Sequence, residues 1–251
     1  MTAGAGARRG GALELVIERR VPTSPRLVEL RFLAEEARVW TCLYEHGEPV
    51  QYAHVARPLR LAEVQTRYAS RPWAAEMPSA GRPLTAAILL ALRRRGVALA
   101  SLTHAAGLSS IGDAELDAVL PLPERYDIPA RTVTLVEAAR ARGGRVIAVG
   151  TTVVRALEGA TREAGRLEAG AGVTGLVIGP GFAPRCVDGL LTGMHAPGES
   201  HYELLRAFVR RPWLDAAIAH AERAGYRNHE FGDTCLIGPD VVAARARPSA
   251  A

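Results

Sequence analysis

The sequence predicts an α/β protein with a mixed sheet and flanking helices, preceded by a small β-rich segment. Two observations predict this. From residue 47 onward, apolar runs alternate with helix-like segments that end in glycine, the pattern of a parallel or mixed sheet. Before residue 47, the chain shows short runs of alternating or β-branched residues. With 251 residues and 48% apolar content, the chain can bury one large core.

The composition divides the chain into four parts. Residues 1–11 are rich in Gly, Ala and Arg, so we expect disorder or an artefact of the assigned start. We expect a β-rich segment over residues 12–46, an α/β catalytic domain over 47–240 and a disordered tail over 241–251. Within the β-rich segment, the runs LELVIERR, RLVELRF and RVWTCLY predict three strands of a small antiparallel sheet or barrel.

The α/β part carries clear helix ends. Residues 83–96 begin with Pro at a first helical position and end with three Arg and a Gly, which together predict a helix. The apolar run VALASLT that follows predicts a buried strand. The same signals predict helices over residues 128–144, 151–165, 200–210 and 213–225, and strands over 145–150, 174–179 and 186–192.

Composition also bears on location and partners. No apolar run approaches the roughly 18 residues of a membrane span, and the first residues lack a secretory apolar core, so we expect a cytoplasmic protein. Cys42, Cys186 and Cys235 lie far apart, which predicts reduced thiols without a disulfide or a cysteine zinc site. All 31 basic residues are Arg and the net charge is +5. This balance suits RNA, but the codon bias of a GC-rich genome explains it equally.

Two segments suit ligand binding. In RVIAVGTTVVRALEG, a strand passes through Gly150 into a helix whose free N–H groups suit a carboxylate or phosphate. The alternative is that Thr152 only caps this helix. In MPSAGRPLT, hydroxyl groups, a flexible backbone and the Arg82 guanidinium gather at a turn before a helix. That loop is either a ligand site or a Gly-Pro turn with Thr85 as its cap.

Histidines follow several predicted strands, where open α/β sheets bind ligands. These are His104, His195, His201 and His229. The grouping of His195, Glu199 and His201 does not predict zinc, because Pro197 and Gly198 interrupt the helix that an HExxH site requires.

The acidic pair Glu230 and Asp233 suits a base and its orienting group, or a turn cap. The chain has no GxSxG, Walker loop or complete GxGxxG fingerprint, so serine hydrolase, NTPase and Rossmann functions lack their signatures.

The order of motifs is more specific than any one motif. The succession is QTRYA, MPSAGRPLT, a helix that ends in Gly-Val, SLTHAAGLSS, PERYDIP, GGRVIAVGTTVVRALE, VDGLLTGMHAPGES and YRNHEFGDTCLI. In this order the chain resembles the S-adenosylmethionine:tRNA ribosyltransferase-isomerase family of queuosine biosynthesis from Gly47 to Ile237. GRVIAVGTTVVRALE and AGRPLT are the most specific matches.

The resemblance implies a large α/β domain with a small β-barrel insertion, of which residues 12–46 would be a remnant in an N-terminally shortened, divergent member. It implies transfer of the ribosyl part of S-adenosylmethionine, the co-substrate, to the 7-aminomethyl-7-deazaguanine base of a tRNA anticodon. Isomerisation gives epoxyqueuosine and releases adenine and methionine. No metal is implied.

This reaction needs a base for the ribose carbon beside the sulfonium and a proton donor for adenine. The resemblance implies His104, His195, Glu230 and Asp233 as candidates for these roles. The helix start at Gly150 and Arg155 would bind the methionine carboxylate. The whole implied co-substrate set is Ser79, Gly81, Arg82, Thr85, Gly150, Thr151, Thr152, Arg155, Glu158 and Asp188.

Departures from the family pattern keep alternatives open. Residues 120–123 replace two His, the Gly198–Glu199 region replaces a Lys, and residues 228–230 alter an aromatic-rich segment. The alternatives are ribosyl transfer from S-adenosylmethionine to a small molecule, and a non-catalytic remnant that binds a nucleoside or RNA.

Overall fold

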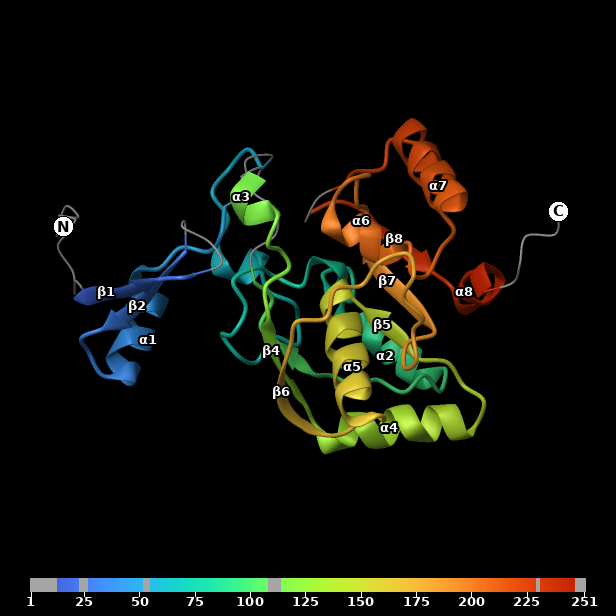
Figure 1. Ribbon diagram of the computed structural model, residues 1–251, viewed down its shortest axis with the longest axis horizontal. Helices are drawn as coiled ribbons and strands as arrows, with labels where there is room; N and C mark the ends of the chain where they lie inside the picture. Colours follow the sequence, from blue (N-terminus) through green and yellow to red (C-terminus); the bar gives the residue numbers. More distant parts are fainter. Residues whose placement is uncertain (1–12, 23–26, 52–54, 108–113, 229–230, 247–251) are drawn as a thin grey trace. The chain divides into compact units, whose positions relative to one another are not determined.

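The computed structural model describes residues 13–22, 27–51, 55–107, 114–228 and 231–246 (Figure 1). The described chain forms two compact units. The smaller contains residues 13–64 and 114–119, and the larger contains residues 65–107 and 120–246. The smaller unit therefore extends past the predicted boundary at residue 46.

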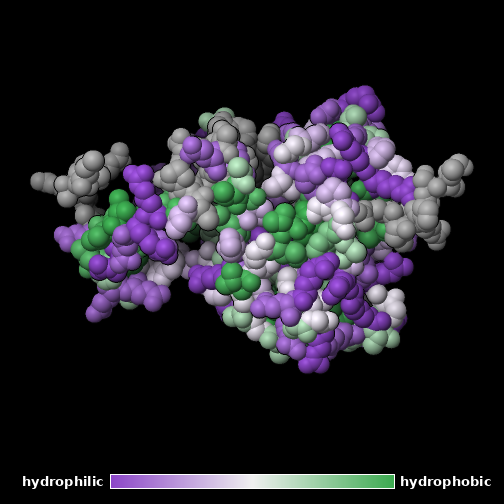
Figure 2. All heavy atoms as spheres, viewed as in Figure 1, coloured by the Kyte–Doolittle hydropathy of each residue, from purple (hydrophilic) through white to green (hydrophobic). Residues whose placement is uncertain are grey.

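The smaller unit begins with an antiparallel hairpin of β1 (Leu15–Arg20) and β2 (Val28–Phe32), two of the three predicted strands. A cross-strand ion pair joins Arg19 to Glu29 at 2.6 Å. Apolar side chains of the hairpin are exposed and form a green area in Figure 2. The unit also contains α1 (Glu36–His46), η1 (Leu61–Glu63) and α3 (Ala114–Asp117). That residues 12–46 are a barrel remnant stays a prediction.

The third predicted strand, RVWTCLY, is wrong because these residues belong to α1. Bonds between residues four apart support the helix: Trp40 Nε1 donates to Glu36 Oε1 at 3.1 Å, and Thr41 Oγ1 donates to the Ala37 carbonyl at 2.9 Å. Short runs with Val, Trp and Tyr satisfy a strand pattern and one helical face equally well.

The larger unit contains two three-stranded sheets, which confirms the mixed α/β fold. One is antiparallel, in the order β3 (Thr103–His104), β4 (Glu124–Ile128), β6 (Gly170–Thr174). The other is mixed, in the order β5 (Ile147–Val149), β7 (Gly189–Gly193), β8 (Thr234–Ile237). In it, β7 runs parallel to β5 and antiparallel to β8.

The predicted helices are present with shifted ends. Thr85 caps α2 by accepting a bond from the Ile88 N–H at 3.3 Å, and Gly165 ends α5 with φ +78°. The helices are η2 (Ser79–Gly81), α2 (Ala86–Arg94), α4 (Ala130–Ala141), α5 (Thr151–Ala164), α6 (Ser200–Leu205), α7 (Arg211–Arg223) and α8 (Pro239–Ala246). No helix of the described residues is long and apolar enough to cross a membrane.

The core of this unit forms where α5 and α6 meet the strands. Val154, Leu190 and Phe208 have no exposed surface, and Tyr202 is 2% exposed. Figure 1 shows α5 beside β5 and β7. A 14-residue helix with one fully buried face fixes the position of its first turn, where the ligand site was predicted.

Two predicted strands are wrong. Residues 97–102 are irregular and Val97 is 46% exposed, so only Thr103 and His104 of that region join a sheet. Over residues 174–179, the strand ends at Thr174 and Val177 is 68% exposed. There the Leu176 carbonyl accepts a bond from Arg155 Nε at 3.1 Å instead of joining a ladder.

The tail predicted to be disordered from residue 241 is helical to residue 246. Asp240 lies in the first turn of α8, where an acidic side chain favours the helix dipole. Val241 and Val242 pack against the core, and this burial holds the helix.

Candidate active site

One edge of the mixed sheet gathers the predicted site motifs. Val149 of β5 pairs with Leu191 of β7, and Gly193 of β7 pairs with Thr234 of β8. The carboxyl ends of β5 and β7 and the amino end of β8 therefore lie at the same edge. Loops at the carboxyl ends of strands are where open α/β sheets bind ligands.

The start of α5 is the first part of this edge. Gly150 is its N-cap, with φ +96°, and its N–H donates to the Leu191 carbonyl at 2.8 Å. Thr151 and Thr152 are the first helical residues, so the hypothesis that Thr152 caps the helix is wrong. No side chain caps the first-turn N–H groups among the described residues. This end of α5 therefore suits an anion.

The η2 loop lies beside that helix start. A β-carbon built on Gly150 would lie 3.9 Å from Cβ of Ala80, which is flanked by the predicted residues Ser79 and Gly81. The Arg82 guanidinium lies 4.3 Å from the centre of the Phe231 ring, which links the loop to the segment before β8. Thr85 is different, because its hydroxyl caps α2. This contact agrees with the alternative hypothesis, in which Thr85 caps the helix after a Gly-Pro turn.

A histidine cluster follows β7. His195 Nε2 and Thr192 Oγ1 lie 3.1 Å apart, and His195 Nδ1 lies 3.8 Å from Glu199 Oε2. The ring of His195 stacks on that of His201 with centres 4.8 Å apart. Burial, together with the charge of His195, lowers the pKa of His201 to about 4. The interaction with the neighbouring His195 ring holds the pKa of Glu199 below its usual value.

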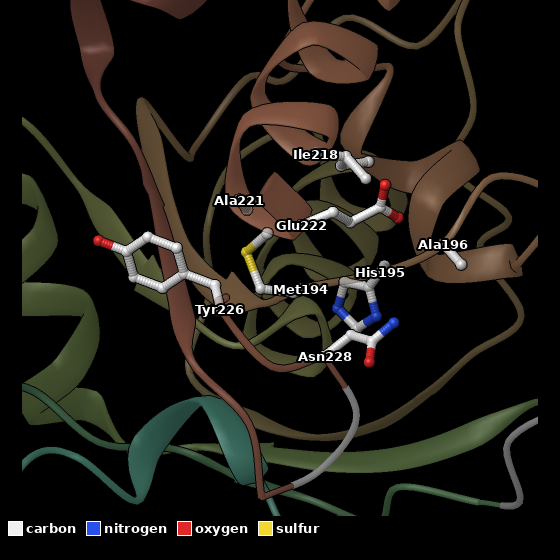
Figure 3. A pocket seen from close by; sticks show the side chains of 8 residues that line it. All are labelled: Met194, His195, Ala196, Ile218, Ala221, Glu222, Tyr226 and Asn228. Atoms are coloured by element: carbon white, nitrogen blue, oxygen red, sulfur yellow. The ribbon is translucent and has the colours of Figure 1, made fainter. Parts of the chain in front are cut away.

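A pocket of about 210 Å³ opens beside this cluster (Figure 3). Its walls come from the segment after β7, from one face of α7 and from the loop after α7. The lining residues are Met194, His195, Ala196, Ile218, Ala221, Glu222, Tyr226 and Asn228. The lining therefore combines apolar side chains with a few polar groups, the usual make-up of a small-molecule site.

Arg155, predicted to bind a carboxylate of the co-substrate, makes its contacts with other parts of the protein. Its guanidinium is ion-paired with Glu124 and donates to the carbonyls of Leu176 at 3.1 Å and Leu122 at 3.3 Å. Burial lowers the pKa of Arg155 and raises that of Glu124. These contacts hold β4 and the irregular segment after β6 in place, and the ligand role of Arg155 stays a prediction.

His104 joins this buried pair. Its side chain is 4% exposed, and its Nε2 lies 3.4 Å from Glu124 Oε2. Within the described residues, neither ring nitrogen makes a hydrogen bond. Burial, and then the charge of Arg155, lowers the pKa of His104 to about 4, so the ring is neutral near pH 7.

Glu158 and Asp188, two other predicted ligand residues, hold the backbone instead. Glu158 is fully buried and accepts bonds from the N–H groups of Arg185, Cys186 and Val187, at 2.8 to 3.1 Å. Asp188 Oδ2 accepts from the Val146 N–H at 2.8 Å. Both contacts fix the start of the β5–β7 pair, and the ligand roles of Glu158 and Asp188 stay predictions.

Asp233 closes a turn, as its structural alternative predicted. Its Oδ2 accepts from the Arg227 N–H at 2.8 Å, while its own N–H donates to the Arg227 carbonyl at 2.7 Å. The predicted residue Glu230, like His229, lies outside the described residues. In the described part of the chain, no three His, Cys, Asp or Glu side chains are placed to hold a metal ion.

Sequence reasoning left several contacting residues out of the predicted site. Glu124 lies in PERYDIP, a segment noted for its resemblance to the family, and His201 follows a predicted strand. Their partners were not visible, because Arg155 is 31 residues from Glu124. The sequence analysis noted Glu199 and His201 without giving them a role, and the residues that it missed are Glu124, Thr192, Glu222 and Asn228.

Comparison with known proteins decides the family. Residues 2–237 match the profile described as "Queuosine biosynthesis protein". The chain belongs to this queuosine biosynthesis family. Among the curated relatives, one from Synechococcus sp. (strain CC9311) is 43% identical over 187 residues, covering 73% of this chain. One from Prochlorococcus marinus (strain MIT 9313) is 45% identical over 212 residues, covering 82% of this chain. Both are named S-adenosylmethionine:tRNA ribosyltransferase-isomerase.

A solved structure supports the same placement in the queuosine biosynthesis family. The S-adenosylmethionine tRNA ribosyltransferase of Thermotoga maritima superposes with a TM-score of 0.53 at 32% identity, covering 62% of this chain and 50% of that one. The chain spans about half the length of the relatives it matches, 51% and 57% for the two named above.

Proposed function

We propose that this chain carries out, or contributes to, transfer and isomerisation of the ribosyl part of S-adenosylmethionine onto a tRNA base. The observation that carries the proposal is the family match over residues 2–237. The acceptor is the 7-aminomethyl-7-deazaguanine of the anticodon, the products are epoxyqueuosine, adenine and methionine, and the protein acts in the cytoplasm.

The sheet edge supports specific roles in that reaction. The uncapped first turn of α5 binds the methionine carboxylate, because its N–H groups and helix dipole favour an anion. The neighbouring loop from Ser79 to Arg82 contacts the ribose. In this proposal the backbone of α5 supplies the anion site, because the Arg155 guanidinium is ion-paired with Glu124.

Proton transfers need groups that can reach the substrate. His195 borders the pocket and is held between Thr192 and Glu199, so we assign it one of the two proton transfers. For the other transfer His104 remains a proposal from the sequence, because its side chain is 4% exposed and faces the Glu124 carboxylate. Glu230 remains a proposal from the sequence alone.

The test is incubation of the purified chain with S-adenosylmethionine, with and without tRNA that bears the aminomethyl base. Mass spectrometry then follows adenine, methionine and the modified nucleoside. We expect all three products only with that tRNA. Adenine release with unmodified tRNA or no RNA would indicate a small-molecule acceptor. No turnover by the folded chain would contradict an independent activity and favour a binding role.

A further inference from the structure

The pocket between the end of β7 and α7 has no assigned ligand, and its size restricts the choice. At about 210 Å³ it is smaller than the roughly 300–1,000 Å³ of sites that enclose drug-sized molecules. It therefore accepts one ring system or a side-chain-sized group, not a whole S-adenosylmethionine molecule.

The lining of the pocket indicates the chemistry of that group. Ile218, Ala221 and Glu222 occupy one face of α7, at the spacing of three and four residues that brings side chains together. Figure 3 shows the Glu222 carboxylate, the His195 ring and the Asn228 amide on one side of the pocket. The lining includes no arginine or lysine, so the pocket does not suit a carboxylate or phosphate.

An ionised carboxylate accepts hydrogen bonds and donates none. A guanine-type base offers it two adjacent N–H donors on one edge, while an adenine edge offers one donor beside an acceptor. The apolar residues Met194 and Ile218 suit the face of a planar ring. The lining thus favours a guanine-type base over adenine.

The surroundings indicate that the base belongs to a polynucleotide. Exposed arginines alternate with lining residues along the chain: Arg223 follows Glu222, and Arg227 lies between Tyr226 and Asn228. Arginines around a neutral or acidic pocket suit phosphates on either side of the bound nucleotide. The Tyr226 ring, 55% exposed, turns away from the three polar groups in Figure 3, in a position to stack on a neighbouring base.

We propose that this pocket receives the guanine-type acceptor base turned out of an RNA strand, with Glu222 accepting the two N–H groups of its edge. This inference rests on the proposed function for the identity of the acceptor. It adds the residues that select the base and separates the base site from the anion site at the start of α5.

The test measures RNA binding by fluorescence anisotropy with the full chain, without S-adenosylmethionine. The probes are an anticodon stem-loop with the 7-aminomethyl-7-deazaguanine base and the same stem-loop with adenine at that position. We expect the chain to prefer the first, and Glu222→Gln to reduce this preference roughly ten-fold or more, since a bond to a charged group is lost. The matched control is Glu137→Gln, which removes an exposed carboxylate on α4, outside the pocket.

A second variant tests the phosphate contact independently. Arg227→Gln should weaken binding of both stem-loops equally and lower the slope of log affinity against log salt by about 0.7. Unchanged preference in a folded Glu222→Gln protein would overturn the inference, as would tighter binding of the adenine stem-loop by the parent chain. If turnover occurs while Glu222→Gln changes nothing, the function stands and the pocket assignment fails. If base preference depends on Glu222 but no turnover occurs, the pocket assignment stands and the proposed function fails.

Discussion

Arg155 on α5 forms a buried ion pair with Glu124 on β4. The pair joins α5, whose first turn forms the proposed anion site, to the antiparallel sheet. Their side chains are 7% and 10% exposed, so little water can solvate either charge if its partner is removed. Removing one partner of such a pair strands the other charge, whereas replacing both groups with uncharged ones avoids that penalty.

We therefore expect Glu124→Gln to lower the free energy of unfolding by about 3–5 kcal/mol. Adding Arg155→Met to that variant should restore a large part of the loss, because no unpaired charge remains. Urea unfolding of both single variants and the double variant completes the cycle. Strictly additive losses would contradict an energetic coupling between the two side chains.

Acid should destabilise the protein through His104 and His201, the first buried and the second partly buried. His104 and His201 have folded-state pKa values of about 4 against an ordinary value of 6.5, so the unfolded chain binds more protons between these values. Their stabilisation is complete above about pH 6.5 and is lost as the pH falls towards 4. Glu124, whose pKa burial raises, opposes this loss as it becomes protonated.

The measurement is the free energy of unfolding in urea at several pH values between 4 and 7. We expect it to fall with pH, and His201→Gln to flatten the decline, since Gln does not titrate. An unchanged slope in this variant would show that His201 is not the group that takes up the proton.

The sequence predicted what depends on local chemistry. Proline, arginine and glycine at the ends of the segment from residue 83 to residue 96 located α2, and the Gly150 to Gly165 span predicted α5 almost to the residue. Local signals failed where a tertiary contact decides the backbone. The Leu176 carbonyl binds Arg155 rather than a strand, and a one-dimensional pattern does not contain that contact.

The candidate site divides in the same way. The helix start at Gly150 was predicted because strand, glycine and helix follow one another in sequence. The functions of Arg155 and Glu158 were assigned to a ligand because their partners come from other elements. Glu158 meets the N–H groups of residues 185–187, 27 to 29 positions later, and only the folded chain brings them together.

Gly150 should be required for both conformation and ligand binding. Its φ of +96° is a value that other residues adopt only with strain of about 1–3 kcal/mol, so Gly150→Ala should destabilise the fold and displace the first turn of α5. Gly165 has φ +78° at the other end of the helix, with no atom within 4 Å of an added β-carbon.

Gly165→Ala is therefore a control that also places a β-carbon at a positive φ, distant from the proposed anion site. Gly165 is left-handed helical (ψ −17°) whereas Gly150 has ψ 146°, so we expect both variants to lose stability in urea and Gly150→Ala to lose more. Only Gly150→Ala should lose affinity for S-adenosylmethionine in calorimetric titration. Equal affinities in the two variants would contradict anion binding at the start of α5.

His195 should matter for turnover more than for folding. It borders the pocket, and Thr192 and Glu199 hold its ring. Loss of a group that transfers a proton lowers kcat by roughly 100- to 10,000-fold. We expect His195→Ala to cause such a loss in adenine release while S-adenosylmethionine still binds, because the proposed anion site lies at α5.

His220→Ala, which removes an exposed imidazole from α7 outside the pocket, should leave kcat unchanged. Wild-type turnover in the His195→Ala protein would exclude this ring from the chemistry. A parallel loss of binding would assign it to substrate positioning instead.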